Sequence, residues 1–311
     1  MVVLVMTLIV FVGLHVVGDP VQTFAPAEAT QAELERITAN LGLDRPLWQQ
    51  YLSFLGGLVQ GDLGRSFIYN EPALQLVISR MPATFELAAV AMLMSVVVGI
   101  SLGIYCGRNP NARLSRAIMA ASIFGFSLPT FWVGIVLIMY FSVHLGWFPS
   151  GGRGDTVEVF GMRLSFLTAN GMSHLLLPAL NLALFKVSLL LRLTRAVMRE
   201  TLPKDYVRFA RAKGLSESRI LGVHVMKNIM IPIVTIVGLE LGSVVAFAVV
   251  TETIFSWPGM GKLIIDSINI LDRPVIVAYL VVIVVMFVML NLIVDIIYAI
   301  LDPRVRLGVT S

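Results

Sequence analysis

Charged residues are scarce in this 311-residue chain: they make up 14% of it, while hydrophobic residues make up 57%. Soluble globular domains carry roughly 25% charged residues. The deficit is also local, because several uncharged apolar runs reach the roughly 20 residues that are needed to cross a bilayer. Such runs can satisfy their backbone groups in lipid only as helices. The composition therefore excludes an ordinary soluble domain and predicts an all-α integral membrane protein.

Cysteine is almost missing as well. Cys106 is the single one, which excludes an internal disulfide and a cysteine-rich metal site. The four histidines are scattered, and neither paired carboxylates nor a Gly-x-Ser-x-Gly elbow is present. The net charge of +4 is too small to indicate nucleic-acid binding. We therefore expect no catalytic residues, no metal site and no nucleic-acid partner, and we predict that the chain is not an enzyme.

A phosphate-binding loop of the form G-x-x-x-x-G-K-[ST] is also absent from the sequence. The nearest segment, Pro258-Gly259-Met260-Gly261-Lys262-Leu263, lacks the first Gly at the required spacing and a hydroxyl after the Lys. It therefore cannot cradle phosphates or hold Mg²⁺. We interpret its glycines as a tight re-entrant turn after Trp257, and we expect no cofactor in this chain.

Six apolar runs are candidate membrane spans. They cover residues 1–17, 87–106, 117–143, 175–191, 229–250 and 275–301. The third contains Pro129, and the sixth is charged only at Asp295. The first is short and no basic residue precedes it, so a secretory signal peptide is its alternative. We favour a retained helix, because Pro20 stands where signal cleavage is poorly tolerated.

Basic residues are unevenly divided among the loops. Segment 192–227 carries nine basic residues and three acids, and the loop between the second and third spans carries three arginines and no acid. Segment 18–82 has four basic residues and seven acids. Because cytoplasmic loops are enriched in Lys and Arg, we expect both termini and the two basic loops to be cytoplasmic.

The longest polar segment between two spans, residues 205–232, predicts two short helices separated at Gly214. Pro203 suits a first helical turn, and Gly214 suits a left-handed C-terminal cap. Ser216 can cap a second helix that runs to Asn228.

The first of these helices has one face of aromatic and small residues. Tyr206, Phe209, Ala210 and Lys213 recur there at steps of three and four. Such a short amphipathic helix is suited to a groove on a partner protein. The alternative is a solvated basic loop that only fixes topology.

This segment resembles the coupling motif of permeases in the dipeptide/oligopeptide/nickel family of ABC importers. The similar run is Asp205-Tyr206-Val207-Arg208-Phe209-Ala210-Arg211-Ala212-Lys213-Gly214-Leu215. It departs from the family at Phe209, where a small residue is common, and Arg208-Phe209-Ala210 replaces the Glu-Ala-Ala of the more general permease motif. Further similar segments follow in order along the chain: Gly18–Pro20, Leu41–Pro46, Gly61–Gly64, Arg80–Thr84, Ser127–Trp132, Glu252–Phe255, Pro258–Gly261 and Asp302–Arg306.

The resemblance implies the fold of a type I ABC importer permease (MetI-like) with six transmembrane helices, and it is strongest to the B-type subunit of such pairs. It implies a first helix at 1–17, an extracytoplasmic region at 18–83, a five-helix transmembrane domain at 84–300 with a coupling loop at 199–228, and a cytoplasmic tail at 301–311. The location implied is the bacterial inner membrane.

The resemblance also implies partners. They are a homologous C-type permease, two ABC ATPase subunits that bind ATP and Mg²⁺, an extracytoplasmic solute-binding protein, and the lipid bilayer. The residues implied to couple to the ATPase are Asp205, Tyr206, Phe209, Ala210, Ala212, Lys213, Gly214 and Leu215.

Two ionisable residues, Lys186 and Glu240, interrupt the fourth and fifth spans. An ionisable group inside a span is costly and by default suggests a function. We expect the two side chains to pair with each other or one of them to face the translocation path. The alternative for Lys186 is that its ammonium snorkels outward to the membrane surface.

The sequence thus predicts a permease subunit of a binding-protein-dependent ABC importer, with di- or oligopeptides as the substrate class. One alternative is a proton-coupled secondary transporter that uses Glu240 and Lys186, although the inverted repeats typical of such proteins are not seen. The other is a membrane-embedded scaffold without transport.

Overall fold

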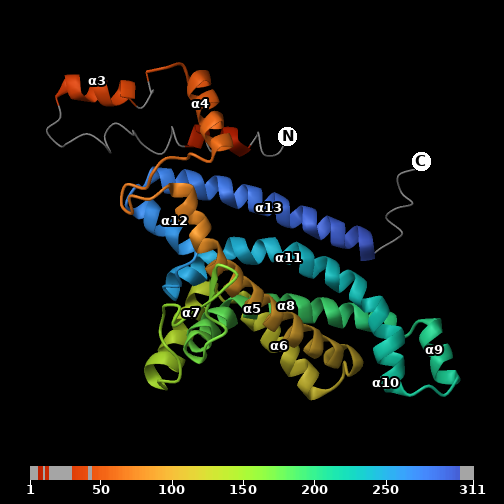
Figure 1. Ribbon diagram of the computed structural model, residues 1–311. Helices are drawn as coiled ribbons and strands as arrows, with labels where there is room; N and C mark the ends of the chain where they lie inside the picture. The colour runs from red at the N-terminus through yellow and green to blue at the C-terminus, as the bar shows by residue number, and fades with distance from the viewer. Residues whose placement is uncertain (1–5, 10, 14–29, 41–43, 302–311) are drawn as a thin grey trace, which may run out of the picture. The chain divides into compact units, whose positions relative to one another are not determined.

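The computed structural model describes residues 6–9, 11–13, 30–40 and 44–301, and helices dominate it (Figure 1). The chain divides into two compact units. The first comprises Met1–Met81 and Leu263–Val288, and the second comprises Pro82–Lys262 and Met289–Ser311. Three helices contribute residues to both: α5 (Ala73–Arg108), α12 (Met260–Asn269) and α13 (Arg273–Leu301).

The first unit also contains α3 (Gln31–Asn40), α4 (Leu47–Gln60) and the helical residues 6–9 and 11–13. Helix α4 ends at Gly61, whose φ of 73° is the left-handed cap that glycine adopts without strain. Tyr51 of α4 contacts the N-terminal residues, because its hydroxyl lies 3.0 Å from Thr7 Oγ1 and its ring lies edge-on to Phe11. The buried carboxylate of Asp272 accepts a hydrogen bond from Ser66 and so anchors the loop after α4.

The second unit holds most of the remaining elements. They are α6 (Arg113–Ser127), α7 (Thr130–Leu137), the π-helix η1 (Ile138–His144), β1 (Val157–Val159), β2 (Met162–Leu164), α8 (Ala169–Thr201), α9 (Asp205–Ala212), α10 (Glu217–Arg219), the π-helix η2 (Ile220–Val225) and α11 (Met226–Ile254). Strands β1 and β2 form an antiparallel hairpin that pairs Val157 with Leu164 and Val159 with Met162.

Four described helices are long and apolar enough to cross a membrane. They are Ala73–Arg108, Ala169–Thr201, Glu217–Ile254 and Arg273–Val294. They contain the predicted second, fourth and fifth spans and most of the sixth. The predicted first span lies largely outside the described residues. The structure therefore supports four spans, or five with the bent pair described next, and the predicted count of six is not confirmed.

The third predicted span is not one straight helix. It breaks between α6 and α7, and the segments Arg113–Ser127 and Thr130–His144 meet at 106°. Leu128 and Pro129 are extended at the break, with ψ of 137° and 133°. Pro129 causes this geometry, because proline disfavours the α conformation of the residue before it and removes a backbone donor.

Helices α5 and α8 approach each other unusually closely along a row of glycines. Gly99, Gly103 and Gly107 repeat every fourth residue and so lie on one side of α5. A Cβ added to Gly103 would lie 2.5 Å from Thr194 Cβ, and one on Gly107 would lie 2.5 Å from Met198 Cβ. Small residues permit such backbone contact between membrane helices. This glycine row fixes α8, the helix that leads into the predicted coupling segment.

Candidate functional site

Helix α9 forms the first half of the predicted coupling segment. It covers Asp205–Ala212 and follows Lys204, whose backbone is extended. Gly214 closes it with φ of 75°, and the Gly214 amide donates to the Arg211 carbonyl at 2.9 Å. The predicted break at Gly214 is confirmed. In Figure 1, α9 and α10 lie where the neighbouring ends of α8 and α11 meet.

The inner face of α9 is anchored in an apolar cluster. Val207 is fully buried and Ala210 almost so, and both belong to a cluster with Met198 of α8 and Ile229 of α11. The predicted face of aromatic and small residues is therefore only partly exposed, because Ala210 turns inward while Tyr206 and Phe209 stay at the surface. Residues 207 and 210 lie three apart on one side of the helix, and the apolar cluster beneath determines which side turns inward.

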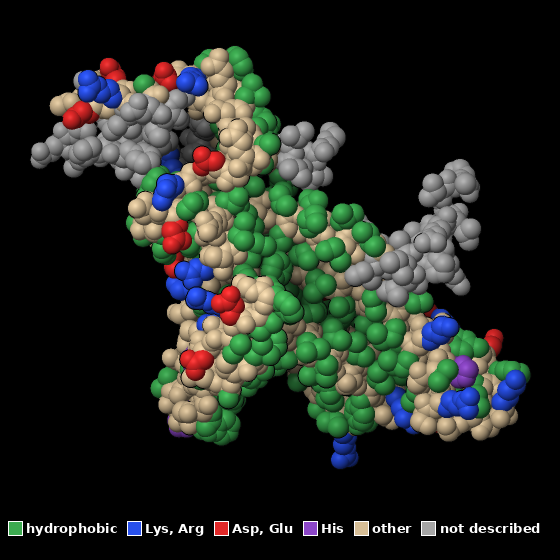
Figure 2. All heavy atoms as spheres, viewed as in Figure 1, with side chains coloured by type: hydrophobic (Ala, Val, Ile, Leu, Met, Phe, Trp, Pro, Cys, Tyr) green, Lys and Arg blue, Asp and Glu red, His purple; other side chains and the backbone are tan. Residues whose placement is uncertain are grey.

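The outer face of α9 is aromatic and basic. Phe209 is 62% exposed and Tyr206 is 38% exposed, and the Lys213 ammonium lies 4.6 Å from the centre of the Phe209 ring. The Tyr206 hydroxyl accepts a hydrogen bond of 3.1 Å from Asn228. Basic side chains gather over this segment, whereas hydrophobic side chains cover much of the helices that lead to it (Figure 2). An exposed phenylalanine is typical of a surface that a partner covers, because aromatic residues are enriched at interfaces.

The remaining predicted coupling residues surround this face. Asp205 is exposed and lies 4.0 Å from Arg208, Ala212 is exposed, and Leu215 is half-buried against the apolar cluster. Arg211 donates to Glu217 at 2.7 Å and so links α9 to α10. This hydrogen bond raises the pKa of the Arg211 guanidinium above its ordinary value.

The predicted second short helix is wrong as a separate element. It begins after Ser216, as predicted, but the Ser216 side chain makes no capping hydrogen bond. Helix α10 continues through η2 into α11, so residues 217–254 form one long helix. The second helix does not end at Asn228 as predicted, because residues 226–254 are helical without interruption. Within this described segment, the turn at Gly214 to Ser216 is thus where the chain leaves α9 and enters the next long helix.

Lys186 and Glu240 form an ion pair, and Ser243 completes the group. The Lys186 ammonium donates to Ser243 Oγ at 2.7 Å, and that oxygen lies 2.6 Å from Glu240 Oε2. The Lys186 side chain does not snorkel outward, which was the alternative. It is 8% exposed and turns toward α11. The structure brings these two predicted residues together.

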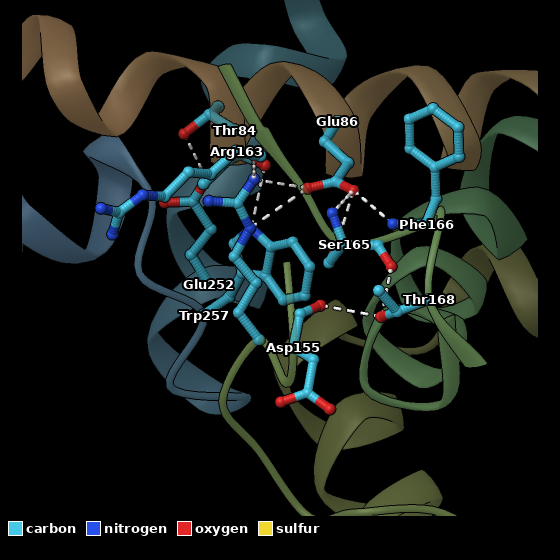
Figure 3. A network of polar contacts seen from close by, with 11 residues as sticks. Thr84, Glu86, Asp155, Arg163, Ser165, Phe166, Thr168, Glu252 and Trp257 are labelled. Carbon is cyan, nitrogen blue, oxygen red and sulfur yellow. Dashed lines mark hydrogen bonds and ion pairs between the residues drawn. The ribbon is translucent and has the colours of Figure 1, made fainter. Parts of the chain in front are cut away.

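A second polar group joins Thr84 of α5 to two motifs near the end of α11, far along the chain (Figure 3). The buried Glu252 carboxylate accepts a hydrogen bond of 2.6 Å from Thr84 and one of 3.0 Å from the Lys262 amide. Thr84 in turn accepts from the Met260 amide at 2.9 Å. A Cβ on Gly259 would lie 2.3 Å from Glu252 Oε1, so glycine is required for this approach. The predicted turn after Trp257 is therefore built around a carboxylate.

A third polar group ties the hairpin region to α5. Glu86 of α5 is buried and forms a 2.6 Å ion pair with Arg153. Its other oxygen accepts from the Ser165 amide and hydroxyl at 2.6 and 2.8 Å (Figure 3). A charged side chain is stable in the interior only when it is paired and hydrogen-bonded, and Glu86 meets both conditions. The pair fixes the segment around β1 and β2.

Sequence reasoning missed several of these residues. Val207 carries the anchor of α9, and its position three residues before Ala210 was a usable signal. The spacing of Gly99, Gly103 and Gly107 was another, because small residues four apart in an apolar run indicate close helix packing. Glu86 gave little local signal. Within the described ranges, no group of three or more His, Cys, Asp or Glu residues is placed to hold a metal ion.

Long apolar helices, with a short amphipathic helix seated between two of them, define an integral membrane protein of the permease class. Residues 99–307 match the family model described as binding-protein-dependent transport system inner membrane component, and residues 1–88 match its N-terminal companion. The chain belongs to this family and is a permease subunit of a binding-protein-dependent ABC importer. This assignment decides against the secondary transporter and the passive scaffold.

Curated relatives cover nearly the whole chain. The di/tripeptide transport system permease protein DppB of Pseudomonas aeruginosa is 38% identical over 96% of this chain and 94% of its own. The oligopeptide transport system permease protein AppB of Bacillus subtilis is 40% identical over 93% and 90%. The glutathione transport system permease protein GsiC of Escherichia coli is 35% identical over 97% and 94%.

A solved structure confirms the fold class. The inward-facing MetNI methionine ABC transporter includes a chain that superposes with a TM-score of 0.57, covering 75% of this chain and 99% of that one. The sequence identity is 16%, so this likeness concerns the fold alone.

Proposed function

We propose that this permease subunit takes up di- or oligopeptides, and that α9 is the helix through which ATPase subunits drive it. The relatives named for di/tripeptides, oligopeptides and glutathione support the substrate class, since all three names denote short peptides. The anchoring of α9 supports the coupling role. A docking helix transmits force only if it is fixed to the spans, and Val207 and Ala210 fix α9 to α8 and α11.

The proposed assembly contains a homologous C-type permease, two ABC ATPases that bind ATP and Mg²⁺, and an extracytoplasmic binding protein. In the bacterial inner membrane, α9 and both termini face the cytoplasm and residues 18–83 lie outside. The transmembrane domain covers 84–300 with its coupling loop at 199–228, and residues 301–311 are a cytoplasmic tail. The excess of basic residues in segment 192–227 supports this orientation.

The proposed mechanism is alternating access. ATP brings the two ATPases together, and the exposed face of Tyr206, Phe209 and Lys213 moves with them. Because the opposite face of α9 is packed against Met198 and Ile229, the ends of α8 and α11 must follow. This is a rigid-body switch that a ligand bound elsewhere biases toward one state.

A matched pair of alanine variants tests the docking face. Phe209→Ala removes an exposed ring, whereas Arg208→Ala truncates a neighbouring side chain on the same helix. We expect Phe209→Ala to weaken binding of the ATPases, measured by co-purification, by about 30-fold or more, the size of an interface hot spot. ATP-driven uptake of dialanine and trialanine into proteoliposomes should fall with it. Equal retention of ATPases in both variants would exclude Phe209 from the docking face.

The anchor is tested separately. Ala210→Asp places a carboxylate in an apolar cluster, and Gly214→Pro cannot adopt the φ of 75° found there. We expect both variants to insert in the membrane while ATP hydrolysis no longer drives peptide uptake. Normal uptake in both would overturn the coupling role of α9. Failure of the wild-type complex to accumulate either peptide would overturn the substrate class.

A further inference from the structure

The ion pair of Lys186 and Glu240 is closed into a compact polar group. The Lys186 ammonium donates to Glu240 and to Ser243, and it lies 5.7 Å from the Phe185 ring centre and 5.9 Å from that of Phe247. A carboxylate, a hydroxyl and two aromatic faces are a set that binds an ammonium group well. In this structure the chain's own lysine occupies that set.

The pair lies deep within its helices. Glu240 is at the midpoint of α11 (Met226–Ile254), and Lys186 is close to the midpoint of α8 (Ala169–Thr201). Half of α11 corresponds to about 21 Å at the helical rise of about 1.5 Å per residue. The ion pair turns the Lys186 side chain toward α11 rather than toward the cytoplasmic end of the predicted fourth span. Both charges are therefore held within the predicted fourth and fifth spans.

One edge of the pair is open. The Glu240 side chain is 24% exposed although Lys186 is nearly covered. Glu240 lies on α11 beside Leu239 and two turns from Phe247, and both of these residues are exposed. An open carboxylate edge facing lipid is strongly disfavoured, so such groups face a water-filled cavity or another protein. In the proposed assembly, the water-filled space beside this edge is the translocation path between the two permeases.

We propose that Lys186 and Glu240 line the translocation path and exchange their mutual contact for the charged ends of the peptide. This inference rests on the proposed function. A short peptide with free ends carries an ammonium and a carboxylate. The peptide ammonium takes the place of the Lys186 ammonium on Glu240 and Ser243, and the peptide carboxylate pairs with Lys186. The number of ion pairs rises as the peptide enters, so its ends are not left unpaired away from bulk water.

Thiol labelling tests whether the group faces water. Ser243→Cys is introduced into a Cys106→Ser background, and the complete complex with its ATPases is treated with a charged methanethiosulfonate reagent. Ser95→Cys is the matched control, because Ser95 is fully buried. We expect the cysteine at 243 to react at least about tenfold faster than that at 95, since thiol reactivity follows exposure. Dialanine, delivered by the binding protein, should slow the reaction.

Labelling at 243 that is as slow as at 95, both without nucleotide and with ATP, would overturn the proposal. So would rapid labelling that dialanine and trialanine do not slow. Neither readout requires net uptake, so a fault in ATPase coupling does not imitate these outcomes.

Charge substitutions separate a path role from a structural one. Glu240→Gln should reduce the rate of dialanine uptake by about tenfold or more. A tenfold decrease corresponds to the loss of about 1.4 kcal/mol from one charged contact. The double variant Lys186→Met with Glu240→Met removes both charges without leaving one unpaired. If the pair lines the path, its uptake stays low although the complex assembles. Wild-type uptake in the double variant would show that the pair is structural only and overturn the proposal. Absent peptide uptake in the wild-type complex would instead count against the proposed function.

Discussion

Helix α8 meets its two neighbours in different ways. Toward α5, a row of glycines brings the two backbones together, and Gly103 leaves no room for a Cβ beside Thr194. Toward α11, polar side chains join the contact beside the apolar cluster of Met198 and Ile229, with Asn181 donating to Thr251 at 3.0 Å and Lys186 paired with Glu240. Close backbone packing has a single good arrangement, whereas hydrogen bonds can change partners. We infer that α5 and α8 move as one body and that the seam between α8 and α11 is the one that rearranges.

The largest expected effect comes from disturbing the α5–α8 seam. Gly103→Val adds a branched side chain where a Cβ would already lie 2.5 Å from Thr194 Cβ. Ordinary overpacking costs about 1–3 kcal/mol. Because the clash involves backbone as well as side chain, we expect Gly103→Val to lower the unfolding free energy by more than about 3 kcal/mol. Denaturant titration of the purified permease in mixed micelles measures this.

Gly125→Val is the matched control. Gly125 lies in α6, and the nearest atom to an added Cβ is Ser188 Oγ at 4.0 Å. Both variants carry the same cost of a β-branched residue in a helix, so their difference reports packing. Equal destabilisation of the two variants would show that the glycine row does not fix α5 on α8.

The second effect concerns the ion pair in the α8–α11 seam. Lys186→Met leaves Glu240 without its cation, and removal of one partner of a buried pair costs about 3–5 kcal/mol. Glu240 is 24% exposed, so we expect about 1–3 kcal/mol in the same titration. The double variant with Glu240→Met should recover most of this loss. A double variant as unstable as the single one would mean that the pair itself holds the seam together.

Much of the α8–α11 seam was predictable from sequence, because a charge in an apolar run is conspicuous. On that ground the sequence predicts Lys186 and Glu240 as a possible pair. Helix α9 and its cap at Gly214 were predictable too, since proline, glycine and amphipathic spacing act locally. The inward turn of Ala210 was not, because it depends on Met198 and Ile229 from other helices.

The bend of the third span and the Glu252 network show the same limit. Pro129 was visible inside that span, yet proline inside a helix can kink it or be tolerated, as Pro178 is in α8. Neighbouring helices decide between these outcomes. Thr84 and Glu252 belong to separate sequence motifs. Their contact joins residues 168 positions apart, and no local pattern encodes such a pairing.

A smaller effect is expected from Asn181→Ala, which removes the hydrogen bond to Thr251 in the α8–α11 seam. Side-chain hydrogen bonds between membrane helices contribute about 0.6 kcal/mol on average. The Asn181 amide oxygen has no hydrogen-bond partner among the residues described, so its removal offsets part of the loss. We therefore expect a decrease of no more than about 0.6 kcal/mol in the unfolding free energy. A decrease above about 2 kcal/mol would indicate a wider polar network than this single bond.

The smallest effect is expected from Ser95→Ala, which removes the corresponding polar contact from the α5–α8 seam. Ser95 Oγ donates to Ala91 O at 2.7 Å within its own helix and lies 3.2 Å from Ala183 O across the seam. Both carbonyls lie within helices, where the backbone supplies donors, so no buried acceptor is left unsatisfied. We expect a change below about 0.5 kcal/mol. If Ser95→Ala costs more than Asn181→Ala, hydrogen bonds rather than glycine packing hold α5 to α8. The distinction between a fixed seam and a movable one would then fail.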